Sequence, residues 1–191
     1  MKNFSNIKVL ALILAYSSFA MADHHASSKH DSQVKYISYS QIGNPADVLE
    51  VKTEASSALN SGEVRVKVLA APINPSDLLQ ISGNYGVAAV LPARPGSEGV
   101  GRVTEVSPQV KNLKVGQLVL LAIGSTWAEE IVAPAEGFLP LPNLGTLSAE
   151  VIEQLAMSAV NPLTALLMLT SYGDIEEGQW IVQSAANSAV G

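Results

Sequence analysis

Cysteine is absent from this 191-residue chain, which excludes disulfide bonds, thiol nucleophiles and thiolate zinc sites. Histidine is scarce: its three copies, His24, His25 and His30, fall in a polar stretch without apolar periodicity. That stretch is typical of a disordered lead-in, although its Asp and His side chains could hold a stray metal ion. The remainder of the sequence has no histidine, which excludes a Ser-His-Asp hydrolase or a histidine-liganded metal centre there.

Positive charge is also scarce, and it is unevenly placed. The chain has 11 basic against 17 acidic residues, a net charge of −6, and its last basic residue is Lys114. Such an acidic protein is a poor partner for nucleic acid or an anionic membrane. A phosphate bound near the carboxyl end would have to be held by backbone N–H groups and a helix N-terminus, or by basic residues of a further segment.

The first 22 residues differ from the rest. A lysine-bearing start precedes an apolar run over residues 9–19, which is too short to span a bilayer comfortably, and then Ala20-Met21-Ala22. This layout is typical of a secretory signal peptide, and a buried strand or an anchor is the alternative. We therefore expect a signal peptide over 1–22, a disordered linker over 23–33, and a periplasmic or secreted protein with no stable membrane insertion. Without a signal peptide, the protein would be cytoplasmic.

Short strands with Gly and Pro punctuation are predicted from residue 34 to about 135. Val64, Val66 and Val68 alternate with Arg65 and Lys67, as in a half-buried strand. Further strands are expected over residues 100–106, 117–122 and 127–132. Several short strands at this spacing indicate a compact, barrel-like β domain.

The pattern turns helical after residue 142. Ser148 is expected to cap a helix that runs to about Met157, and Asn161 to cap a second one with Pro162 at its first position. Apolar residues on more than one side of the second helix predict burial between layers. A buried strand over 180–183 would then enter a parallel α/β unit.

The last eight residues follow that strand as the phosphate turn of a dinucleotide-binding unit would. Ala186, Ser188 and Gly191 fall on the three glycine positions of G-x-G-x-x-G, so one glycine of three is present. An ordinary strand-to-loop transition would look the same. The chain stops before the helix that should follow, so we expect a fragment: a substrate domain and the first pieces of a cofactor domain.

Seven short motifs stand in a distinctive order from residue 73 onwards: Ile73–Asp77, Gly83–Gly86, Pro95–Gly101, Leu113–Gly116, Gly124–Glu129, Val160–Ala165 and Ala185–Gly191. The ordered set resembles the medium-chain dehydrogenase/reductase superfamily, nearest its zinc-independent enoyl thioester reductase branch, with quinone reductases next. The resemblance covers about residues 34–191. It implies a fold between α+β and α/β, in which a GroES-like, β-barrel-type domain (34–145) precedes the truncated start of a Rossmann domain (146–191).

The resemblance also implies a reaction, the NADPH-dependent reduction of the C=C bond of a 2-enoyl thioester without zinc, with NADH not excluded. Ser97 stands where zinc-dependent members commonly have a histidine. Tyr85 is the implied proton donor, because a phenol both donates and accepts hydrogen bonds, and a turn tyrosine packed on the domain is the alternative. An NADPH:quinone or enone reductase, or an inactive truncated binding module, is the alternative function.

The same resemblance implies a cofactor site. Asn161 would contact the nicotinamide end, although a helix cap needs no further role. The phosphate turn would be formed by Asn187, Ser188, Ala189 and Val190. We expect a small-molecule substrate and no nucleic acid, and a homodimer is compatible with the sequence.

The sequence predicts structural roles for four further side chains. Asn74 and Asp77 are expected to hold the loop before Tyr85, and Glu98 to be a structural carboxylate. Trp127 is expected in the core, with an acyl pocket as the alternative.

Overall fold

The computed structural model describes residues 33–188 and 190. The predicted signal peptide, most of the predicted linker, Ala189 and Gly191 lie outside the described residues. The linker prediction is wrong at its last residue, since Gln33 already belongs to a strand, where it pairs with Ala55.

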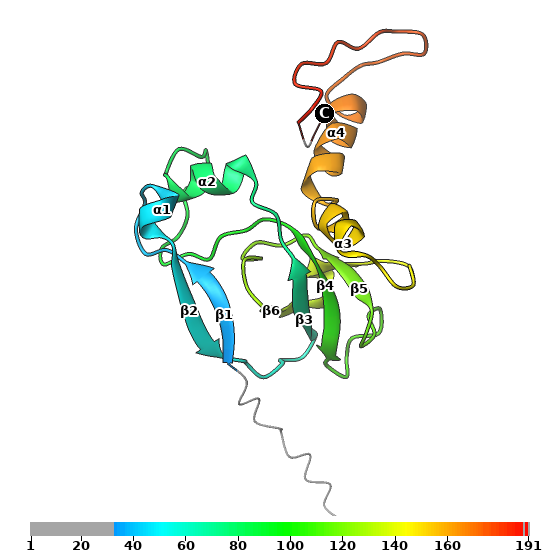
Figure 1. The fold of residues 1–191 in the computed structure, drawn as a ribbon. Helices are drawn as coiled ribbons and strands as arrows, with labels where there is room; N and C mark the ends of the chain where they lie inside the picture. The colour runs from blue at the N-terminus through cyan, green and yellow to red at the C-terminus, as the bar shows by residue number, and fades with distance from the viewer. Residues whose placement is uncertain (1–32, 189, 191) are drawn as a thin grey trace, which may run out of the picture.

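Two antiparallel sheets form the main body (Figure 1). The smaller pairs β1 (Gln33–Ser38) with β2 (Glu50–Ala55), and the short helix α1 (Pro45–Val48) lies between them in sequence. The larger has the order β6-β3-β4-β5-β7. Its strands are β3 (Glu63–Ala70), β4 (Gly99–Val106), β5 (Leu118–Leu121), β6 (Glu130–Pro134) and β7 (Phe138–Pro140), with the 3-10 turn η1 (Ala135–Gly137) before the last. This confirms the predicted β domain.

A cluster of apolar side chains packs along this sheet, and the sequence predicts the alternation of those that come from β3. Val64 and Val66 of β3 are fully buried, and they pack with Val103, Val119 and Phe138. The two sheets are tied together where β1 meets the segment before β6, because the Ile37 N–H donates to the Trp127 carbonyl at 2.9 Å. That contact explains why β6 starts at Glu130 and not at 127 as predicted: the preceding residues pair with β1.

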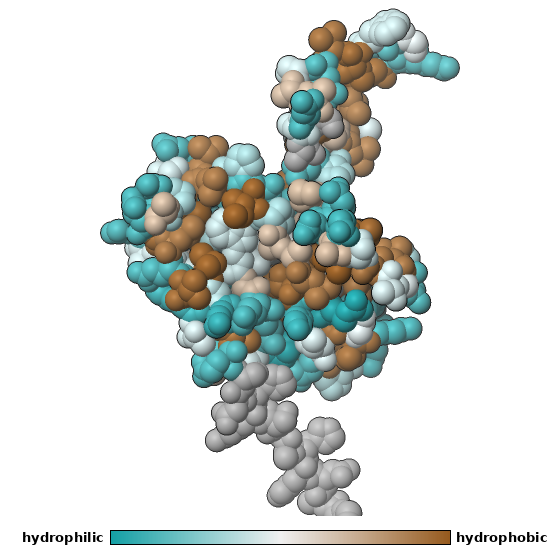
Figure 2. Space-filling view, viewed as in Figure 1, coloured by the Kyte–Doolittle hydropathy of each residue, from teal (hydrophilic) through white to brown (hydrophobic). Residues whose placement is uncertain are grey.

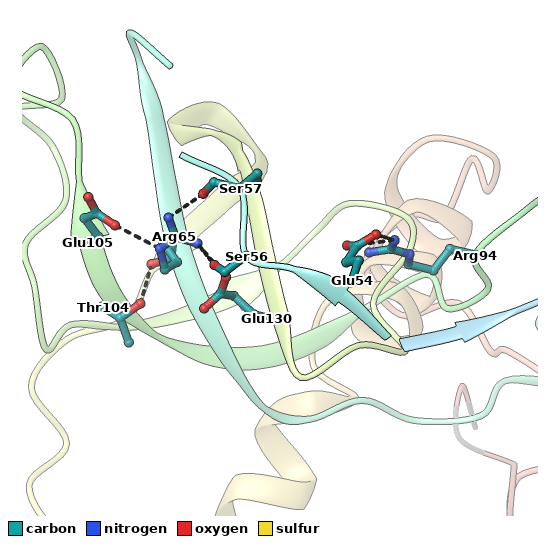
Figure 3. A network of polar contacts seen from close by, with 8 residues as sticks. All are labelled: Glu54, Ser56, Ser57, Arg65, Arg94, Thr104, Glu105 and Glu130. Atoms are coloured by element: carbon teal, nitrogen blue, oxygen red, sulfur yellow. Dashed lines mark hydrogen bonds and ion pairs between the residues drawn. The ribbon is translucent and has the colours of Figure 1, made fainter. Parts of the chain in front are cut away.

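Arg65 departs from the predicted alternation, because its side chain is only 2 % exposed. Its Nε donates to Glu105 at 2.9 Å, its Nη1 to Glu130 at 2.5 Å and its Nη2 to the Ser57 carbonyl at 2.6 Å (Figure 3). Burial alone would lower the pKa of Arg65, but the hydrogen bonds and charges of the two glutamates outweigh it and raise that pKa. A charged side chain is tolerated inside only when it is paired in this way.

Three longer helices complete the fold: α2 (Pro75–Ile81), α3 (Ala149–Ala156) and α4 (Val160–Thr170). As predicted, Ser148 caps α3, accepting the Val151 N–H at 3.4 Å. On its apolar side, Ala156 packs against Val100 and Leu118 of the sheet. The predicted cap at Asn161 is wrong: α4 begins at Val160, and Asn161 is its second residue.

The last part of the chain departs most from expectation. Residues 180–183 form no strand, and Trp180 and Val182 are each 96 % exposed. A strand needs neighbours for its backbone hydrogen bonds, and none lies beside this segment in residues 33–188. The predicted burial of α4 is also wrong, since Leu163 and Leu166 are more than half exposed, and Figure 2 shows apolar surface along the helix.

Within the described ranges, no single helix is long and apolar enough to cross a membrane, although α3 and α4 pass that test together across a bend of 46°.

Candidate active site

The start of α2 is built by two buried polar side chains. Asn74 precedes the helix, and its backbone N–H donates to Asp77 Oδ2 at 2.8 Å. Asp77 Oδ1 accepts the hydroxyl of Ser97 at 3.0 Å, from the loop that leads into β4. The expectation that Asn74 and Asp77 hold this loop agrees with these contacts, which tie α2 to the sheet.

Glu98 lies at the centre of the same cluster and is fully buried. Its Oε1 accepts the amide of Asn74 at 3.0 Å and, with a longer contact of 3.5 Å, that of Asn161. Its Oε2 accepts two backbone N–H groups, from Ala159 at 3.1 Å and Val160 at 2.8 Å. Four N–H donors converging on one carboxylate replace the water that burial removes.

These contacts explain why Asn161 is not the helix cap. The first N–H groups of a helix lack partners within it, and a side-chain oxygen normally accepts them. Here that oxygen comes from Glu98, which lies in the sheet domain. A carboxylate at this end also interacts favourably with the helix dipole. The N-terminus of α4 is therefore already occupied by an anionic side chain.

Asp77 shares this buried site with a second carboxylate. Burial raises the pKa of Asp77, the hydrogen bonds from Asn74 and Ser97 lower it, and the neighbouring Glu98 charge raises it again. The net result is a raised pKa.

Tyr85 lies in the loop that follows α2. Gly83 ends the helix with a φ of +77°, and the Asn84 N–H donates to the Leu79 carbonyl at 2.8 Å. The next residue, Tyr85, is 47 % exposed. The base of the loop is thus fixed while the phenol remains accessible to a ligand, and its role as proton donor stays a prediction.

The predicted cofactor residues fall in two places. Asn161 is only 8 % exposed and belongs to the Glu98 cluster. Asn187, Ser188 and Val190 lie in the segment after α4, where the Ser188 N–H donates to the Ala185 carbonyl at 2.9 Å. Ala189 lies outside the described residues. Figure 1 shows this segment at the far end of α4, away from α2.

The segment after α4 folds back on that helix. A pocket of about 520 Å³ lies between them, lined among others by Met168, Leu169, Ser184, Ser188 and Val190. The structure therefore brings Asn161 together with the buried cluster, and the predicted phosphate turn together with the last turns of α4.

A larger apolar groove of about 580 Å³ runs between the small sheet and the end of β3. Its walls include Tyr36, Val51, Ile73 and Trp127. Trp127 is partly buried, and its Nε1 donates to the Pro72 carbonyl at 2.9 Å. Because Ile73 directly precedes Asn74, one end of the groove adjoins the polar cluster. Trp127 also packs against the buried cluster of Tyr39, Val48 and Ile81, so it contributes to the core, as expected, and to the wall of this groove. The acyl nature of the groove stays a prediction.

Sequence reasoning missed the role of Glu98 in holding α4 and the side chains of Tyr36 and Val51 in the groove. The acidic residue in a glycine-rich motif was a signal for the first. A buried carboxylate needs donors, and the sequence alone does not say that two of them come from a backbone some 60 residues later.

Comparison with known proteins places these features in a family context. The model of the alcohol dehydrogenase GroES-like domain matches residues 60–143, inside the predicted β domain. The human mitochondrial enoyl-[acyl-carrier-protein] reductase is 38 % identical over 172 residues, which are 89 % of this chain and 45 % of that protein. The chain thus spans about half the length of the curated relatives it matches.

Solved structures of reductases are similar to this chain as well. The mitochondrial 2-enoyl thioester reductase heterodimer of Candida tropicalis is 34 % identical, with a TM-score of 0.72 over 83 % of this chain and 49 % of that one. A complex of the reductase Etr1p with NADP and crotonyl-CoA is 31 % identical, with a TM-score of 0.65 over 78 % of this chain and 46 % of that one. A protein assigned as an NADPH:quinone reductase, from Bacillus thuringiensis, is 36 % identical, with a TM-score of 0.66 over 76 % and 43 %.

Proposed function

Because this chain belongs to the medium-chain dehydrogenase/reductase superfamily, in its enoyl reductase branch, we propose that the protein reduces the C=C bond of 2-enoyl thioesters with NADPH. The observation that carries the proposal is the 38 % identity with the human enoyl reductase, which extends over 172 residues and so includes more than the GroES-like domain. Since those relatives are about twice as long, the activity is proposed for the whole protein.

The reaction requires the transfer of a hydride and of a proton to the two carbons of the double bond. NADPH, when bound, supplies the hydride that the β carbon needs. Tyr85 gives its hydroxyl proton to the α carbon and regains one from solvent, to which its half-exposed side chain has access. The products are the saturated thioester and NADP⁺, so atoms and charge balance with one proton taken from water.

Two groups of residues would hold the cofactor. Asn161 fits the nicotinamide end, because its Nδ2 faces Glu98 and its Oδ1 accepts no hydrogen bond from the described residues. That oxygen can accept the carboxamide N–H of the ring. Asn187, Ser188, Ala189 and Val190 would form the phosphate turn, as the resemblance implies. Because no basic residue follows Lys114 in this sequence, the donors to the phosphates would be backbone N–H groups that are not already paired, or basic residues of a further segment. NADH remains an alternative donor.

The proposed reaction uses no zinc. The donor set supports this: cysteine is absent, residues 34–191 have no histidine, and Ser97 donates to Asp77 at the place where zinc-dependent members commonly have a histidine. Among the described residues, no three carboxylate side chains come together as metal ligands would.

Quinone or enone reduction is the second candidate. It is favoured by the Bacillus thuringiensis structure, whose identity to this chain is comparable to that of the enoyl reductases. A binding module without turnover is the remaining alternative. A homodimer is also proposed, since the Candida tropicalis relative is a heterodimer of two reductase chains.

A rate comparison separates these functions. NADPH oxidation is followed with crotonyl-CoA and with a benzoquinone under the same conditions. We expect kcat/KM to be higher with crotonyl-CoA. A higher value with the quinone supports the second candidate, and binding of NADPH without oxidation by either substrate supports the binding module.

Export is proposed from the layout of residues 1–22, whereas the relatives carry a mitochondrial designation in their names. Amino-terminal sequencing of the mature protein tests it: export by a signal peptide predicts a first residue at Asp23, and retention of Met1 excludes cleavage.

A further inference from the structure

We propose that Glu98 is a positioning residue: it sets the amide orientation of Asn161 and joins the start of α4 to the start of α2, the helix that precedes Tyr85. The inference rests on the proposed function only where Asn161 meets the cofactor. Its structural part concerns three elements that lie far apart in the sequence and meet at one carboxylate.

The orientation of Asn161 follows from hydrogen-bond chemistry. A carboxylate can only accept, so the amide side that faces Glu98 must be the Nδ2 donor. The carbonyl side of Asn161 is then turned away from Glu98. An uncharged or absent side chain at position 98 would let the amide turn, and its acceptor would no longer have a fixed direction.

The connection to Tyr85 runs through α2. Asn74 donates its side-chain amide to Glu98 and its backbone N–H to Asp77, which is part of the same helix. Tyr85 follows the C-terminal end of that helix by four residues. Glu98 therefore contacts both the element that precedes the proton donor and the element that carries the nicotinamide contact.

The number of N–H donors around Glu98 makes the Glu98→Gln substitution a direct test of its positioning role. Four N–H donors meet two carboxylate oxygens, and a glutamine offers only one oxygen. Either the backbone pair of Ala159 and Val160 or the side-chain pair of Asn74 and Asn161 must lose its acceptor. The volume of the side chain hardly changes, so the packing around it is kept.

The first measurement needs no ligand. In the unsubstituted protein, NMR should detect a coupling across the hydrogen bond between the Val160 nitrogen and the carboxyl carbon of Glu98. In Glu98→Gln, hydrogen exchange at Ala159 and Val160 or at the Asn161 side chain should be about tenfold faster or more, with amides of Val66 and Val103 unchanged. Glu153→Gln, an exposed carboxamide replacement in α3, is the matched control and should change nothing.

The second measurement asks whether Glu98 acts through Asn161. The dissociation constant of NADPH is compared among the unsubstituted protein, Glu98→Gln, Asn161→Ala and the double variant. We expect each single change to weaken binding about tenfold and the double variant to be no weaker than Asn161→Ala alone, as for residues of one unit. Additive effects of the two changes overturn the positioning role.

The outcomes separate this inference from the proposed function. Absence of the coupling together with unchanged exchange in Glu98→Gln overturns the inference, whatever the cofactor result. If Glu98→Gln fails to fold, the coupling in the unsubstituted protein decides, and Glu98→Asp, which keeps both acceptor oxygens, should retain more protection than an alanine. If Asn161→Ala leaves NADPH binding unchanged, the cofactor role of Asn161 fails, and with it the claim that Glu98 acts on the cofactor.

Discussion

The backbone N–H of Val160, the first residue of α4, donates to the carboxylate of Glu98 at 2.8 Å, so a side chain of the sheet domain caps a helix of the following segment. The GroES-like part and the helical segment that follows it are therefore connected by a buried, charge-assisted contact as well as by the chain. This relationship fixes where Asn161 lies relative to Asn74, and hence relative to the helix before Tyr85.

Tyr85→Phe tests the proton donor. The change removes one hydroxyl and keeps the ring, so substrate binding should be little affected while kcat for crotonyl-CoA falls by about 10²–10⁴. Steady-state kinetics measure both parameters. Tyr172→Phe is the control, since Tyr172 is 86 % exposed and lies after α4. Full turnover in Tyr85→Phe would remove this residue from the mechanism.

Arg65→Ala tests the buried ion network. Two glutamates, the Ser56 hydroxyl and the Ser57 carbonyl would lose their common donor, and a loss of about 3–5 kcal/mol in the free energy of unfolding is expected. Urea unfolding measures it. Arg102→Ala removes an exposed arginine that donates to the Gly116 carbonyl, and should cost less than about 1 kcal/mol. Equal losses in the two variants would contradict the account of Figure 3.

Gly96→Ala tests a close approach of backbone and side chains. Gly96 has a φ of +98°, and a Cβ there would lie 2.4 Å from Thr126 Oγ1 and 2.9 Å from the Trp127 nitrogen. The backbone cost and the clash together should lower the free energy of unfolding by about 3 kcal/mol. Gly86→Ala, with no atom within 4 Å and no positive φ, should change it by less than about 1 kcal/mol. Thermal unfolding of the pair gives the comparison.

Asp77 predicts a specific pH dependence of stability. Its pKa is raised in the folded protein, so its contribution to folding is full below the unfolded pKa, at about pH 4, and is lost as the pH rises through the folded value. Relative to Asp77→Asn, the unfolding free energy of the unsubstituted protein should therefore fall as the pH rises from about 4 towards neutrality. Urea unfolding at several pH values tests this, with the exposed Asp174→Asn as control. A difference that grows with pH would contradict it.

Local patterns predicted much of this fold. Alternating valines located β3 and part of its core, and Ser148 located the start of α3, because each signal acts within a few residues. The errors have distant causes. Arg65 is buried because Glu130 meets it from 65 positions away. Asn161 is not a cap because Glu98 accepts the first N–H groups of the helix from 61 and 62 positions away. The predicted strand over 180–183 failed because no described strand pairs with it.

The candidate site likewise has a part that the sequence predicted and a part that only the fold shows. The motifs identified Tyr85 and Asn161 through a family resemblance, and comparison with known proteins confirms that family. The roles of single residues depend on positions in space that no motif specifies. The contact of Asn161 with Glu98 emerged only from the fold, and the phosphate-binding roles of Asn187, Ser188, Ala189 and Val190 stay predictions.

The most direct test of the central claim, enoyl thioester reduction, follows the transferred atoms. The protein is incubated with crotonyl-CoA and NADPH deuterated at the transferred C4 position, and the thioester product is analysed by mass spectrometry and NMR. The account predicts butyryl-CoA that carries a single deuterium at its β carbon and a solvent-derived proton at its α carbon. Recovery of unchanged crotonyl-CoA from a preparation that oxidises the same cofactor with a quinone would contradict it.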